Sequence, residues 1–98
     1  MAQVYKAKGK VWLWPGEQGV WHFAHVDKKL SEEIKEKHTR VRRGFGSVRV
    51  KVTIGKTSWK TSIFPDKRSG TYLLPLKAAA RRAEGLAEGD TIAFTLTI

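Results

Sequence analysis

Apolar and polar residues alternate along much of the chain, and this period of two is typical of β-strands that bury one face. The alternation is clearest over residues 48–54, where three valines and an isoleucine share one parity and Arg49, Lys51 and Thr53 share the other. The same pattern predicts strands at residues 3–14, 20–26, 48–54, 57–64, 71–76 and 91–98. Most of the chain is therefore expected to be sheet.

Two segments break the alternation and are expected to be short helices. Residues 28–38 follow Asp27, which is a suitable N-cap, as is Ser31. The alanine-rich residues 77–84 precede Gly85, which suits a helix end because glycine readily adopts a positive φ.

Turn signals link neighbouring strands. Pro15-Gly16 and Gly55-Lys56 are tight-turn pairs, so each predicts a hairpin. Closely spaced strands with two brief helices, and no regular alternation of strand and helix, favour an antiparallel sheet over a parallel α/β arrangement. The predicted fold is mainly β, a small closed or partly open antiparallel β-barrel of about six strands with two short helices. The length of 98 residues suits one domain, residues 1–98.

Charge and composition narrow the function. The chain has 19 Lys and Arg against 9 Asp and Glu, and this net charge of +10 points to polyanionic partners. The absence of cysteine excludes disulfides, thiolate metal sites and a cysteine nucleophile. No apolar run approaches the roughly 18 residues of a membrane span, and the first residues do not resemble a leader. We therefore expect a soluble, cytoplasmic protein without a membrane partner.

The strongest functional signal is a stretch without acidic residues. Between Lys37 and Pro65 there is no Asp or Glu, while Lys and Arg recur. Arg49 and Lys51 share the outward parity of their strand and Lys60 returns across the hairpin, so these cations are expected to gather where phosphates bind. The predicted polyanion-binding residues are Arg42, Arg43, Phe45, Arg49, Lys51 and Lys60. The alternative is a basic face that is merely solvated.

Two nucleotide-binding motifs are matched only in part. Residues 43–50 resemble the RNP1 octapeptide of RNA-recognition motifs, but Phe45 is the single aromatic residue, so a glycine-assisted bend into the next strand is the favoured interpretation. Residues 55–58 resemble the end of a phosphate-binding P-loop, yet the first glycine and the following helix are missing. Neither motif is predicted to function as such.

The tryptophans form a second group of interest. Trp12 and Trp14 share parity with the three preceding lysines, so an unbroken strand places both indoles on the basic side, where they can stack on bases or sugars. A bulge at Gly9 would reverse that orientation. Trp21 and Trp59 are expected to fill the core.

The alternative to polyanion binding is a small-molecule site. At the mouth of the barrel, Trp12, Trp14 and Tyr72 are expected to line a pocket for a small organic or anionic ligand. A structural or engineered scaffold domain without its own activity is a third possibility.

No catalytic, metal or cofactor site is predicted. His22 and His25 lie three apart in a strand, hence on opposite faces, and His38 ends a helix, so they do not indicate a metal site. No nucleophile elbow and no inward pair of carboxylates occurs. We favour a binding module over an enzyme, with nucleic acid or another polyanion as its partner, acting as a monomer or small homo-oligomer.

Several motifs in one order resemble the DUF1905 family of small bacterial domains. They are Gly44-Phe45-Gly46-Ser47-Val48, Trp59-Lys60-Thr61-Ser62-Ile63-Phe64-Pro65-Asp66, Tyr72-Leu73-Leu74-Pro75 and Glu88-Gly89-Asp90. The likeness runs over nearly the whole chain and implies a small β-barrel with short helices, but no particular activity. The last quarter also resembles the half-module of AbrB-type swapped-hairpin barrels, which bind DNA as dimers, and this resemblance supports barrel topology.

Overall fold

A computed structural model of the chain describes residues 3–16, 19–38, 42–43 and 46–98, with the backbone alone for residues 42–43. Within these ranges the chain forms strands β1 (Val4–Gly16) and β2 (Gly19–His25), helix α1 (Lys28–Lys37), strands β3 (Arg42–Arg43), β4 (Ser47–Ile54), β5 (Thr57–Asp66) and β6 (Thr71–Pro75), helix α2 (Ala78–Glu84) and strand β7 (Thr91–Thr97).

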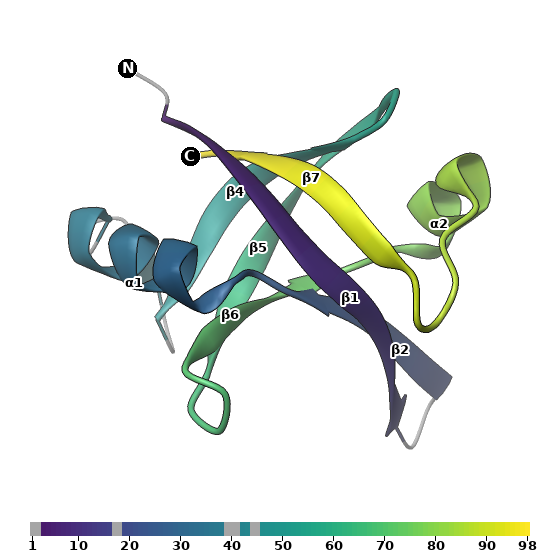
Figure 1. Cartoon of the computed structure of the whole chain (residues 1–98), viewed down its shortest axis with the longest axis horizontal. Helices are drawn as coiled ribbons and strands as arrows, with labels where there is room; N and C mark the ends of the chain where they lie inside the picture. The colour runs from purple at the N-terminus through teal and green to yellow at the C-terminus, as the bar shows by residue number, and fades with distance from the viewer. Residues whose placement is uncertain (1–2, 17–18, 39–41, 44–45) are drawn as a thin grey trace.

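The strands close into a barrel. They pair in the order β3-β4-β5-β6-β2-β1-β7, every pairing is antiparallel, and an additional pairing of β4 with β7 joins the ends of the sheet (Figure 1). Six strands thus form the closed barrel, while β3 pairs only with the start of β4. The predicted mainly β fold, an antiparallel barrel of six strands with two short helices, is confirmed.

The predicted strands agree with the observed ones, apart from one turn. Pro15 and Gly16 belong to β1 and pair with Val20 and Gly19 of β2, so the turn expected at Pro15-Gly16 is wrong. The hairpin itself is present, because strand pairing continues past the proline. Gly55 has a φ of 57° and joins β4 to β5 as expected, since a two-residue hairpin turn requires a positive φ there.

Alternation along β4 separates the core from solvent. Its valines and isoleucine are at most 5% exposed, whereas Arg49 and Lys51 between them are exposed. Matching positions of the other barrel strands fill the same interior, and Ile34 of α1 and Ala80 of α2 join them. Each fully buried aliphatic side chain contributes roughly 1.5–3 kcal/mol, so this shared interior is the main source of stability.

Helix α1 is fixed to the barrel by its first turn. The Asp27 carboxylate accepts a hydrogen bond from the Leu30 amide at 3.3 Å, so Asp27 is the N-cap. Ser31 is instead buried, where its hydroxyl donates to the Val26 carbonyl at 2.9 Å and accepts from the Tyr72 amide at 3.0 Å. One hydroxyl thereby links α1 to β6.

In the described part of the chain, no helix is long and apolar enough to cross a membrane.

Strand β1 changes partner in its middle. Its first half, through Lys10, pairs with β7, and its second half, from Val11, pairs with β2. At the change, a Cβ on Gly9 would run into the carbonyl oxygen of His25, so the end of β2 approaches the backbone of β1 where a side chain would stand. Only glycine permits this approach. Side chains on both sides of Gly9 keep their alternation, so the strand has no reversal there.

We predict that Gly9→Ala lowers the free energy of unfolding by about 1–3 kcal/mol, because the added methyl group forces two backbones apart. Urea denaturation of the purified domain measures the change. Lys10→Ala, at the exposed neighbouring position, is the control and should shift stability by less than about 0.5 kcal/mol. A Gly9→Ala variant as stable as the wild type would contradict the close approach.

Candidate functional site

One outer face of the barrel, running over β1, β7, β4 and β5, carries exposed cations on β1, β4 and β5. Six exposed side chains, which we call the basic face, make up this set: Lys6, Lys8, Lys10, Arg49, Lys51 and Lys60. Strand β7 lies between β1 and β4 and adds threonine hydroxyls. Because neighbouring strands lie about 4.8 Å apart, the closed sheet brings segments distant in sequence within reach of one chain-like ligand.

The basic face contains a like-charge pair. Lys51 and Lys60 are directly opposite each other on β4 and β5, and Lys51 is also opposite Thr97 of β7. Together with Arg49 they line a shallow hollow of about 210 Å³. Like charges in directly opposed positions are destabilising, so this arrangement costs the folded domain some stability.

No carboxylate of the described residues forms an ion pair with these cations. Among the described residues, ion pairs join Glu33 to Lys37 and Asp66 to Arg68, and neither pair involves the basic face. Its charges are therefore available to an anionic ligand.

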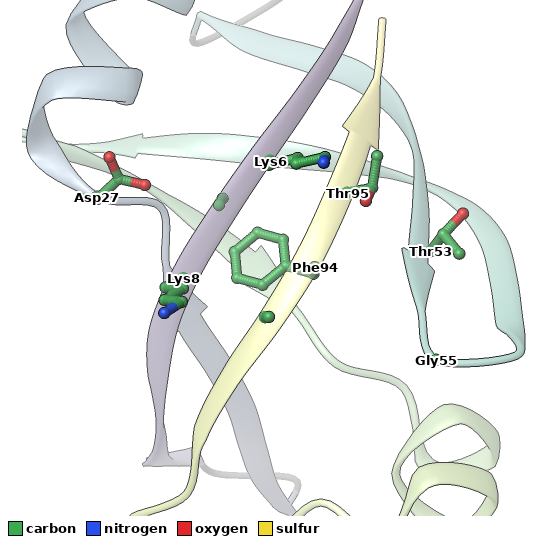
Figure 2. A pocket seen from close by; sticks show the side chains of 9 residues that line it. Lys6, Lys8, Asp27, Thr53, Gly55, Phe94 and Thr95 are labelled. Carbon is green, nitrogen blue, oxygen red and sulfur yellow. The ribbon is translucent and has the colours of Figure 1, made fainter.

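A larger hollow of about 550 Å³ lies over the first half of the same face. Figure 2 shows Lys6, Thr95 and Thr53 in a row across β1, β7 and β4, as their pairing requires. A hydrogen bond of 2.9 Å between the hydroxyls of Thr53 and Ser58 continues the row onto β5. Asp27, the N-cap of α1, also lines this hollow. The face thus offers hydroxyl groups and ammonium groups side by side.

The predicted polyanion-binding residues divide into two groups. Arg49, Lys51 and Lys60 come together on the basic face as expected. The backbones of Arg42 and Arg43 pair with β4 opposite Val48 and Ser47, while their side chains, and Phe45 entirely, lie outside the described part of the chain.

The predicted polyanion-binding residues did not include the lysines of β1, which are Lys6, Lys8 and Lys10. Their outward parity was readable from the alternation, but their neighbours were not. The pairing of β7 with both β1 and β4 brings β1 within one strand of β4. Lys6 then lies two residues out of register with Lys51, whereas Lys8 and Lys10 lie progressively farther along β1.

Aromatic side chains gather beyond the basic face, on β1 and β2. A hollow of about 370 Å³, which we call the aromatic hollow, is lined by Trp12, Trp14, Trp21, Phe23, Arg68 and Leu73. Trp12 is opposite Phe23 and Trp14 is opposite Trp21 in the β1–β2 pairing. Trp14 is 43% exposed and Trp21 57% exposed, so their rings are open to ligands.

Two expectations about aromatic residues need correction. Trp21 was expected in the core, but it faces outward because Ala24 and Val26 take the inward parity of β2. The expected trio of Trp12, Trp14 and Tyr72 is also not brought together, since Tyr72 is only 3% exposed and its side chain belongs to the core. Trp59, in contrast, is in the core as expected.

Arg68 supplies the aromatic hollow with a cation. Its guanidinium lies 5.4 Å from the centre of the Trp14 ring, and its Nε lies 3.9 Å from an oxygen of Asp66. The hydroxyl of Ser69, which donates to Asp66 at 2.8 Å, lowers the pKa of that carboxyl, and Arg68 lowers it further. Asp66 is therefore held in its charged form beside the arginine.

Trp12 forms the inner wall of the aromatic hollow. Its ring stacks on His25, with centroids 5.3 Å apart and planes 18° apart, and His25 shares a hydrogen bond of 2.8 Å with the Thr71 hydroxyl. These contacts hold Trp12 in place beneath the more exposed rings.

Comparison with protein-family models identifies the family of the chain. A family model described as "Domain of unknown function (DUF1905)" matches residues 8–96. The chain belongs to the DUF1905 family. The match covers β2 to β6 and both helices of this DUF1905 domain, together with most of β1 and β7. A search of curated proteins finds no match.

His22 lies on the inward parity of β2 in the DUF1905 domain, apart from the basic face. Arg81 of α2 donates to its Nε2 at 3.2 Å, and its Nδ1 is buried without a hydrogen-bond partner among the described residues. Burial lowers the pKa of His22, and the positive charge of Arg81 lowers it further. Folding therefore favours the neutral imidazole of His22 over the protonated one. No group of three or more metal-ligating side chains occurs in the ranges that the structure describes.

We predict that stability of the DUF1905 domain falls as the pH drops below about 6.5, because His22 binds a proton more readily in the unfolded chain than in the folded one. The contribution is fully present above that pH and is lost as the pH falls through the lower folded-state pKa. Urea denaturation at about pH 7.5 and about pH 5 measures it. In His22→Gln this part of the pH dependence should disappear, and an unchanged pH dependence would contradict the assignment.

Proposed function

We propose that this DUF1905 domain is a binding module, not an enzyme, that holds nucleic acid or another polyanion on its basic face. The observation that carries the proposal is the set of six exposed cations on β1, β4 and β5, none of them in an ion pair with a carboxylate of the described residues. Neutralising several phosphates with such cations releases counterions, which favours binding irrespective of sequence.

The opposed lysines support a polyanionic partner. Lys51 and Lys60 repel each other in the free domain, and a phosphate bound between them relieves that repulsion. Arg49 adds a planar guanidinium that donates two parallel hydrogen bonds to a phosphate. The intervening hydroxyls, including Thr53 and Thr95, suit contacts to phosphate oxygens.

The shape of the face favours an extended ligand. Side chains two apart on one strand are separated by about 6.8 Å, and those on alternate strands by about 10 Å, so the six cations form an array and not a single pocket. A polymer with regularly spaced charges engages such an array more fully than one small anion does.

We expect the domain to act in the cytoplasm, as a monomer or small homo-oligomer.

The alternative function, a pocket for a small organic or anionic ligand, rests on the aromatic hollow. Its volume of about 370 Å³ falls within the range of small-molecule sites. Tyr72 is not part of it, which leaves the two tryptophans that were expected there, Trp12 and Trp14, with partners from β2. A change in tryptophan fluorescence during a ligand screen would favour this alternative.

We predict that binding to a fluorescent single-stranded oligonucleotide weakens steeply as salt rises from about 50 to about 200 mM. The double variant Lys51→Gln, Lys60→Gln should bind more weakly, and the slope of log K against log salt should become shallower by about 1.4, because two phosphate contacts are lost. Fluorescence anisotropy at several salt concentrations provides both quantities.

The matched control is Lys29→Gln, Lys35→Gln, which removes the same charge from exposed positions of α1. It should leave the slope nearly unchanged. Equal slopes for the two double variants would mean that net charge alone drives binding, and no binding at low salt would refute the proposal.

A further inference from the structure

The outward side chains of β1 connect the basic face to the aromatic hollow. Five alternate positions, all on the outer side of one unbroken strand, follow one another in the order Lys6, Lys8, Lys10, Trp12 and Trp14. Each step along the strand covers about 6.8 Å. The cations therefore lead directly to the indoles, along the length of β1 that Figure 1 shows at the front of the barrel.

Two of the aromatic rings that line the aromatic hollow remain exposed to solvent. Trp14 and Trp21 are opposed across two strands and remain about half exposed, and the rings of Trp21 and Phe23 are nearly parallel, with planes 10° apart. Single exposed apolar residues are common on protein surfaces, but a contiguous aromatic cluster marks a binding site. The exposed surface of these rings suits a flat ligand.

Charge decides which flat ligand fits. Aromatic cages also hold quaternary ammonium groups, but here Arg68 already lies over the Trp14 ring and Lys10 stands next to Trp12. None of the described residues lining the hollow is acidic. A cationic ligand would be repelled by Arg68 and Lys10, of which only Arg68 has a carboxylate partner among the described residues, whereas both attract a flat group attached to an anionic backbone.

A nucleobase on a phosphodiester chain has this chemistry. Bases in a duplex are already stacked on one another, so only an unpaired strand can place them against the indoles. We propose that the domain binds single-stranded nucleic acid, with phosphates along Lys6, Lys8 and Lys10 and bases stacked on Trp14 and Trp21. This inference rests on the proposed function of the basic face and adds the kind of nucleic acid and the site of base contact.

The test compares probes of equal charge that differ in their bases. Fluorescein-labelled single-stranded DNA of about 12 nucleotides is compared with an abasic phosphodiester chain of the same length and with the corresponding duplex. The wild type should bind the single strand at least about tenfold more tightly than the abasic chain, since each stacked base adds affinity. Trp14→Ala, Trp21→Ala should abolish that preference and leave binding of the abasic chain and the duplex unchanged.

Two further variants keep the test decisive. Trp14→Phe, Trp21→Phe retains flat rings and should keep part of the preference, even if alanine at these positions impairs folding. Val20→Ala, at a β2 position that is 54% exposed but does not line the hollow, should keep all of it.

The outcomes separate the two proposals. Equal affinity of the wild type for the single strand and the abasic chain, or an equal loss for all three probes in the alanine variant, would overturn base stacking and leave the basic face in place. Absence of binding to any of the probes at low salt would overturn both proposals.

Discussion

The structure depends on the close approach of β2 to the backbone of β1 at Gly9. There β1 leaves β7 and begins to pair with β2, and the carbonyl of His25 occupies the space of a missing side chain. Because the strand passes this point without reversing its side chains, one strand serves both halves of the barrel. Its lysines and its tryptophans consequently lie on the same outer side, although they have different neighbours.

Closure of the barrel then brings cationic side chains from distant parts of the sequence onto one face. The pairing of β7 with both β1 and β4 places Lys6 of β1 one strand away from Lys51 of β4, which lies more than 40 positions later in the chain. Hydrophobic burial inside the barrel is large enough to tolerate the repulsion that results. An opposed pair such as Lys51 and Lys60 weakens the free domain and strengthens its attraction for phosphate, so its structural cost and its proposed function have one cause.

Local periodicity predicted the strands and the helices, because each depends on residues close in sequence. The order of these elements along the chain then favoured an antiparallel barrel. It could not decide which parity of β2 is buried, since both carry apolar residues. The register with β1 decides this, pairing buried Val11 with Ala24 and placing Trp21 outside. The lysines of β1 were not included in the predicted site for a related reason. Their neighbours depend on pairing between strands that are distant in sequence. A turn was expected at Pro15-Gly16 because this pair is typical of tight turns. The expectation is wrong because the missing amide proton of Pro15 does not prevent strand pairing at this end of β1.

Nuclear magnetic resonance mapping of the domain with a short single-stranded oligonucleotide tests the central claim most directly, because it reports on every strand at once. If the outward side of β1 is a continuous track for nucleic acid, the amides near Lys8 and Lys51 and the indole N–H signals of Trp14 and Trp21 shift together. The buried indole of Trp59 should stay unchanged. Shifts centred on α1 or α2, with the signals of Trp14 and Trp21 unmoved, would contradict the account.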